Sequence, residues 1–160
     1  MRLLLSAVVA SLFALPAWAD NNDHVAFYMG AFDISQGDDE AIQLGLEYRY
    51  EDIFYGLRPT VGANYTSDDA FYGYGGFYWD IAVLEDLYIS PNFVAGYYSD
   101  GDGKELHNDL EFRSGIEVSY DMQNDYRVGV AFNHISNASL GDHNPGSETL
   151  LFSVQVPLAY

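Results

Sequence analysis

Hydrophobic and polar residues alternate along most of this chain with a period of two. In residues 41–50, Leu44 and Leu46 fall on one face of an extended chain. Gln43 and Glu47 fall on the other face. A period of two is the signature of a β-strand. The same analysis predicts eight strands, at residues 24–34, 41–50, 54–66, 70–83, 87–98, 108–120, 126–136 and 148–158.

The lengths of these segments favour a membrane barrel. Most have about ten residues or more, which exceeds the usual strand of a soluble sheet but suits a tilted strand that crosses an outer membrane. Connections that are polar and acidic alternate with connections that are mostly tight. The polar ones are residues 35–40, 67–69, 99–107 and 137–147, and the tight ones are residues 51–53, 84–86 and 121–125. The sequence therefore predicts an all-β fold, an eight-stranded antiparallel transmembrane β-barrel of the bacterial outer membrane. A secreted lipocalin-like barrel is the alternative.

The polar face of the predicted strands carries charges of both signs, with glycines between them. Its charged members are Glu47, Arg49, Arg58, Glu111, Arg113, Glu117 and Arg127. Opposite charges can pair inside a narrow eight-stranded lumen, and the glycines leave room for the long side chains. The apolar face would then meet lipid.

Three places disturb the strand pattern. Pro59 and Pro91 fall inside predicted strands, where proline removes a donor from the hydrogen-bond ladder. Gly75 and Gly76 interrupt the alternation of the fourth segment. We expect β-bulges at these positions, with both prolines near the periplasmic rim.

The N-terminus has the form of a secretory signal peptide. Arg2 supplies a positive charge, residues 3–15 form an apolar core, and residues 17–19 read Ala-Trp-Ala, a small-x-small cleavage site. We expect residues 1–19 to be cleaved and residues 20–160 to form a single barrel domain. A membrane anchor is the alternative, although the apolar segment is short for one. The expected location is the outer membrane, with outer-membrane lipids as neighbours.

The composition excludes several functions. The chain has 24 acidic and 6 basic residues, so it lacks the basic face that nucleic-acid binding needs. Because it has no cysteine, it has no disulfide, no thiolate zinc site and no thiol nucleophile. His24, His107 and His143 lack a mutual metal-ligand spacing, and we expect no metal site.

One cluster of residues carries the chemistry of acyl transfer. His134 and Ser136 are two apart on a predicted strand, so they share its lipid-facing side, and Glu148 has the same parity on the next strand. In a triad His134 would take the proton of Ser136, and Glu148 would hold the imidazole. Asn137 could supply an oxyanion donor. Equally, these residues could be rim polar groups that meet headgroups and water.

The motif around these residues resembles a known enzyme family. His-x-Ser-Asn-Ala at residues 134–138, followed by Asn-Pro-Gly-x-Glu at residues 144–148, is similar to the lipid A 3-O-deacylase (PagL-like) family. The resemblance implies an eight-stranded outer-membrane barrel with a Ser-His-Glu triad on its outer surface. It also implies hydrolysis of the ester-linked acyl chain at position 3 of lipid A without a metal or other cofactor. His134, Ser136 and Glu148 match the triad, and Asn137 matches the oxyanion contributor.

The function expected from this resemblance is that of an outer-membrane serine esterase that deacylates lipid A or lipopolysaccharide. A non-enzymatic barrel for adhesion or envelope structure is one alternative. The same mechanism acting on phospholipid acyl esters is another. The sequence leaves the acyl-chain preference and the formation of a homodimer open.

Overall fold

The computed structural model describes residues 23–35, 40–122 and 125–158. Within these residues it contains β-strands and no helix, so no helix there is long and apolar enough to span a bilayer. The strands are β1 (His24–Phe32), β2 (Ala41–Arg49), β3 (Leu57–Thr66), β4 (Phe71–Trp79), β5 (Ile81–Ala82), β6 (Leu87–Ser99), β7 (Leu110–Asp121), β8 (Arg127–Ser136) and β9 (Ser147–Pro157). The predicted signal peptide, residues 1–19, lies outside the described residues.

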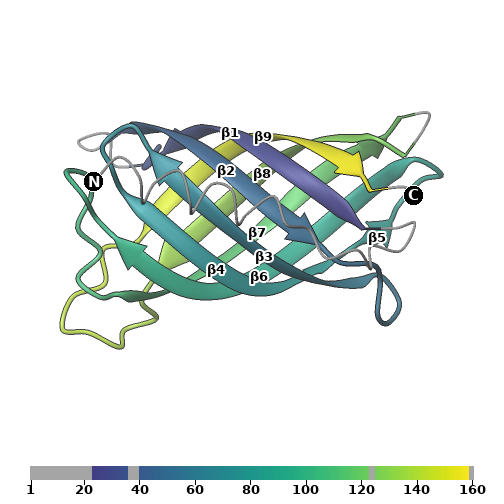
Figure 1. The fold of residues 1–160 in the computed structure, drawn as a ribbon. Coiled ribbons are helices and arrows are strands. Elements are labelled where there is room, and N and C mark those ends of the chain that lie inside the picture. The colour runs from purple at the N-terminus through teal and green to yellow at the C-terminus, as the bar shows by residue number, and fades with distance from the viewer. Residues whose placement is uncertain (1–22, 36–39, 123–124, 159–160) are drawn as a thin grey trace, which may run out of the picture.

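The strands form one closed antiparallel sheet (Figure 1). Its order is β4-β3-β2-β1-β9-β8-β7-β6-β5, and β4 also pairs with β6, which closes the wall. β5 has two residues and pairs with β6 alone, so eight long strands make the barrel. The prediction of an eight-stranded antiparallel barrel is confirmed. The predicted segment at 70–83 is in fact β4 followed by β5.

The two ends of the barrel differ as the loop lengths predict. The segments that follow β3, β6 and β8 lie at the left end of Figure 1. The turn after β2 and the C-terminal end of β9 lie at the right end. We refer to the left end as the outer end, because long loops of outer-membrane barrels face the exterior.

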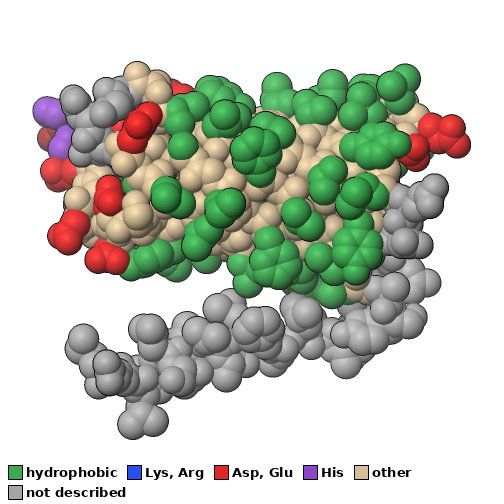
Figure 2. Space-filling model, turned by 90° about the horizontal axis from the view of Figure 1, so that it is seen from above, with side chains coloured by type: hydrophobic (Ala, Val, Ile, Leu, Met, Phe, Trp, Pro, Cys, Tyr) green, Lys and Arg blue, Asp and Glu red, His purple; other side chains and the backbone are tan. Residues whose placement is uncertain are grey.

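The outward face of the wall is apolar. Large exposed side chains recur at every second position, including Phe27, Met29, Phe93, Ile116 and Phe152. Figure 2 shows these hydrophobic side chains distributed along the body of the barrel, with acidic side chains at its two ends. A band of this kind matches the hydrocarbon of a membrane, since the apolar side chains would otherwise meet water.

The lumen is filled by a network of buried charges. Arg49 donates to Glu47 from Nε at 2.7 Å and to Glu117 from Nη2 at 2.9 Å. Arg113 donates to the other oxygen of Glu47 at 3.4 Å. These four side chains are buried, and the guanidinium of Arg49 also stacks 3.6 Å from the ring centre of Tyr78. Pairing compensates the charges for their loss of water, as the mixed signs of this face predict.

The expectation of β-bulges is wrong. Pro59 pairs with Phe77 and Pro91 pairs with Ile116 within uninterrupted registers, and so do Gly75 and Gly76. Pro59 is tolerated because it lies opposite Tyr50, beyond the end of β2. The carbonyl of Tyr50, which would accept the missing proline N–H, accepts from Nε of Arg58 at 2.8 Å instead.

The buried network makes a prediction about stability. Glu117 accepts hydrogen bonds from Arg49, from Tyr28 at 2.9 Å and from Gln155 at 2.6 Å. Glu117→Ala should lower the free energy of unfolding by about 3–5 kcal/mol, because it leaves buried partners uncompensated. Urea unfolding of the detergent-solubilised barrel measures this. Glu85→Ala, in an exposed turn, is the control, and equal stability of the two variants would contradict the role of the network.

Candidate active site on the lipid-facing wall

A His–Glu pair lies on the outer surface of the wall, near the outer end. His134 of β8 is paired in register with Glu148 of β9, and both side chains point outward. Nδ1 of His134 lies 2.9 Å from Oε1 of Glu148. Because an ionised carboxylate only accepts, Nδ1 carries the proton, and in the neutral imidazole Nε2 is then the acceptor. This tautomer is the one that a general base needs.

Ser136 lies two residues beyond His134, as the last residue of β8. It is half-buried, and its partner on β7 is Phe112. Residues two apart on a strand project to the same face, about 7 Å apart along the chain. Among the described residues, no hydrogen bond joins Ser136 Oγ to His134. The structure therefore forms the His–Glu pair and places Ser136 beside it on the same face.

A sharp turn follows Ser136 and is fixed by Asn137. Ala138 and Ser139 both have left-handed backbone conformations, with φ of 52° and 63°. The amide of Leu140 donates to the carbonyl of Asn137 at 3.0 Å, and the amide of Ser139 donates to its side-chain oxygen at 3.0 Å. The chain thus reverses direction immediately after Ser136.

The donors of Asn137 are all engaged. Its side-chain Nδ2 donates to the carbonyls of Leu106 at 3.0 Å and His143 at 2.7 Å. Its backbone amide donates to Oδ1 of Asn144 at 3.0 Å. Asn137 is fully buried and joins the loop after β6 to the loop after β8. The sequence analysis did not anticipate this structural role, and the oxyanion role of Asn137 stays a prediction.

The return of the chain to β9 brings Gly146 against the imidazole. Gly146 has a φ of 64°, the left-handed region that glycine tolerates best. A Cβ atom at this position would lie 2.8 Å from Cε1 and 3.4 Å from Nε2 of His134. A larger residue here would be strained by the backbone and would have to displace the imidazole, so Gly146 leaves room for the ring in its observed position.

The sequence analysis missed a segment that holds β9 from its other side. The amide of Ile34 donates to the carbonyl of Glu148 at 3.1 Å, and the hydroxyl of Ser35 donates to Oε2 of Glu148. Oδ1 of Asp33 accepts from Ser147 Oγ at 3.1 Å and from Lys104 Nζ at 2.5 Å. These contacts follow from the pairing of β1 with β9, and the alternation of hydrophobic and polar residues alone does not specify which strands pair.

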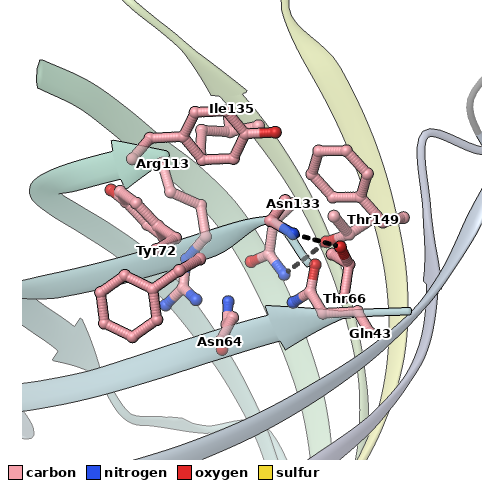
Figure 3. A pocket seen from close by; sticks show the side chains of 12 residues that line it. Gln43, Asn64, Thr66, Tyr72, Arg113, Asn133, Ile135 and Thr149 are labelled. Atoms are coloured by element: carbon pink, nitrogen blue, oxygen red, sulfur yellow. Dashed lines mark hydrogen bonds between the residues drawn. The ribbon is translucent and has the colours of Figure 1, made fainter. Parts of the chain in front are cut away.

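Polar side chains support the same strands from the lumen. Asn133 of β8 and Thr149 of β9 are in register next to the His134–Glu148 pair but point inward, where Asn133 donates to Thr149 at 3.2 Å. Figure 3 shows these side chains lining a small pocket together with Arg113. This hydrogen bond fixes β8 against β9 directly behind the candidate site.

The described part of the chain has no exposed lysine or arginine. All five of these residues are buried, namely Arg49, Arg58, Lys104, Arg113 and Arg127. The face in Figure 2 accordingly shows no Lys or Arg side chain. In the same residues, no group of three or more His, Asp or Glu side chains is arranged to hold a metal ion.

The fold and the site together define a class of protein: a membrane β-barrel with a His–Glu pair and a nearby serine on its lipid-facing wall. A family model for lipid A 3-O-deacylase (PagL) matches residues 45–157, and the chain belongs to this family. The match spans the whole candidate site. No curated protein matches this chain.

Solved structures show the same fold. The crystal structure of the outer membrane enzyme PagL matches with a TM-score of 0.62 and 21% identity, over 84% of this chain and 99% of that chain. Neisserial surface protein A (NspA) matches with a TM-score of 0.58 and 13% identity, over 84% and 95%. A de novo designed transmembrane β-barrel matches with a TM-score of 0.58 and 12% identity, over 86% and 99%. The barrel fold supports location in the outer membrane.

The contact of Gly146 with His134 generates a prediction. Gly146→Ala should lower the deacylase activity expected of this family about a hundredfold, the order that a displacement of about 1 Å costs at a reacting group. Hydrolysis of a long-chain ester by the folded barrel measures this. Gly141→Ala is the matched control in the same loop, because its Cβ would meet nothing closer than 3.5 Å. Full activity of Gly146→Ala would show that the ring position is not set by this glycine.

Proposed function

We propose that this barrel is a serine esterase of the outer membrane that removes the 3-O-linked acyl chain of lipid A. The observation that carries the proposal is the outward-facing His134–Glu148 pair with Ser136 on the same face. Family membership supports the deacylase chemistry, and the position of the site supports a lipid substrate. We propose lipopolysaccharide as the partner, without a metal or other cofactor.

The mechanism follows from the proposed roles. Ser136 Oγ attacks the ester carbonyl carbon and passes its proton to Nε2 of His134. Glu148 remains ionised and stabilises the imidazolium through Nδ1. The tetrahedral intermediate collapses, and the sugar hydroxyl leaves with the proton from His134. Water, activated by the same imidazole, then hydrolyses the acyl-serine and releases the fatty acid.

The oxyanion role of Asn137 places a condition on the loop. Its backbone amide follows the proposed nucleophile directly, which is where an oxyanion donor is needed. In the structure this amide donates to Asn144. To stabilise the oxyanion, this amide must give up its hydrogen bond to Asn144 and donate to the substrate oxygen instead. We therefore propose that the loop of residues 137–146 adjusts when substrate binds.

The lipid-facing wall next to the site suits an acyl chain. Val130, Phe132, Leu150 and Phe152 lie on the outward face of β8 and β9, on the membrane side of the His–Glu pair. A chain lying along them would keep its methylene groups in apolar surroundings. The substrate ester would then reach Ser136 without leaving the bilayer.

The decisive test compares lipid A from cells that express the wild type or Ser136→Ala. The wild type should remove one acyl chain, which mass spectrometry detects as the loss of that chain's mass. Ser136→Ala should lose at least about a thousandfold in rate, because removal of a triad nucleophile leaves only binding and oxyanion contributions.

The matched control is Ser114→Ala. Ser114 is exposed on β7 and is paired in register with His134, so it presents a second serine hydroxyl next to the imidazole on this wall. We expect Ser114→Ala to remain active. Loss of activity in Ser114→Ala alone would reassign the nucleophile. Unchanged lipid A with folded wild type would favour a phospholipid substrate or a non-enzymatic barrel, and phospholipid vesicles separate these two.

A further inference from the structure

The side chain of Glu148 has two oxygens, and the two have different partners. Oε1 faces Nδ1 of His134 at 2.9 Å, whereas Oε2 accepts the hydroxyl proton of Ser35. A Glu side chain on an outer wall has several rotatable bonds, and one hydrogen bond leaves its carboxylate free to turn. Donors on both oxygens fix the plane of the carboxylate and therefore the direction of the imidazole.

Ser35 is itself held in place without help from the carboxylate. The neighbouring amide of Ile34 donates to the backbone carbonyl of Glu148 at 3.1 Å. One residue earlier, Asp33 binds Ser147 Oγ at 3.1 Å and Lys104 Nζ at 2.5 Å, and all three of these side chains are buried. Residues 33–35 are thus hydrogen-bonded to residues 147–148 through both backbone and side chains.

Lys104 compensates the buried charge of Asp33 in these contacts. It is the one lysine of the chain, and it comes from the loop between β6 and β7 to pair with the buried carboxylate of Asp33. Without it Asp33 would be a buried uncompensated charge, which proteins avoid. Residues 33–35 and the loop between β6 and β7 therefore meet at the start of β9, behind the residue that orients the base.

We propose that Ser35 is a positioning residue that holds the Glu148 carboxylate in the orientation the His134 base requires. This inference rests on the proposed triad. It predicts that the hydroxyl of Ser35 contributes to the reactivity of Ser136 through Glu148, and not through the general order of the loop.

The test measures how fast a long-chain alkyl fluorophosphonate labels Ser136 in the folded, detergent-solubilised barrel. In this reaction Ser136 Oγ forms a bond to phosphorus, fluoride leaves, and the Oγ proton goes to Nε2 of His134. The probe needs no lipid A, so the labelling rate reports the triad independently of the natural substrate.

Ser35→Ala should lower the labelling rate about tenfold, the order of a hydrogen bond to a charged group. Ser35→Thr should keep the labelling rate near that of the wild type. Ser35→Val has the shape of the threonine variant without the hydroxyl, so its labelling rate should fall as that of Ser35→Ala does. The matched control is Ser67→Ala, because Ser67 also donates to a carboxylate in an outer loop, that of Asp68 at 3.2 Å. We expect it to label at the wild-type rate.

A double-mutant cycle separates positioning from a structural role. In a Glu148→Ala background, adding Ser35→Ala should change the rate by less than about twofold, because the group on which Ser35 acts is gone. An equal tenfold loss in both backgrounds would overturn the proposal, as would a normal rate in Ser35→Ala or Ser35→Val.

The outcomes also separate this inference from the proposed function. Wild type that is not labelled at Ser136 would overturn the triad and the role of Ser35 together. Wild type that is labelled, shows the Ser35 dependence and leaves lipid A intact would support the positioning role while overturning the assignment of lipid A as substrate.

Discussion

The structure depends on closing the sheet. Hydrocarbon offers no water to the backbone, so every N–H and C=O of a membrane-spanning strand must be paired within the protein. Each of the eight long strands pairs with a neighbour on both sides, including β1 with β9 and β4 with β6, so no long strand has an open edge. Closure also places Ser35 beside Glu148, more than a hundred residues away in sequence. The surroundings of the candidate site are therefore a product of the same constraint that makes the barrel.

A closed barrel of eight strands has an interior just wide enough for side chains. Here that interior takes the charges, and Glu47, Arg49 and Glu117 fill it as a hydrogen-bonded network. Because strands alternate, each lumen residue has an outward neighbour. Asn133 and Thr149 brace the inside of β8 and β9, and His134 and Glu148 stand on the outside one position away. The hydrogen-bonded interior thus supports the candidate site on the outer wall.

Much of the barrel was predictable because alternation is a local signal. The eight strands, the inward charges and the outward parity of His134, Ser136 and Glu148 all follow from residues two apart. What alternation did not predict depends on side-chain hydrogen bonds. The missing N–H of Pro59 is compensated by Arg58, so no bulge is needed. Nor does alternation predict that Asn137 donates to the carbonyls of Leu106 and His143, or that Ser35 donates to Glu148 across the pairing of β1 with β9.

The outward position of the His134–Glu148 pair bears on how the rate of any lipid reaction at this wall depends on concentration. A lipid reaches such a site by lateral diffusion within the leaflet, so its effective concentration is its mole fraction among the surrounding lipids. Adding inert lipid or detergent dilutes the substrate in two dimensions, even when its bulk concentration is unchanged. For such a reaction the mole fraction of the substrate among the lipids, and not its bulk concentration, would set the rate.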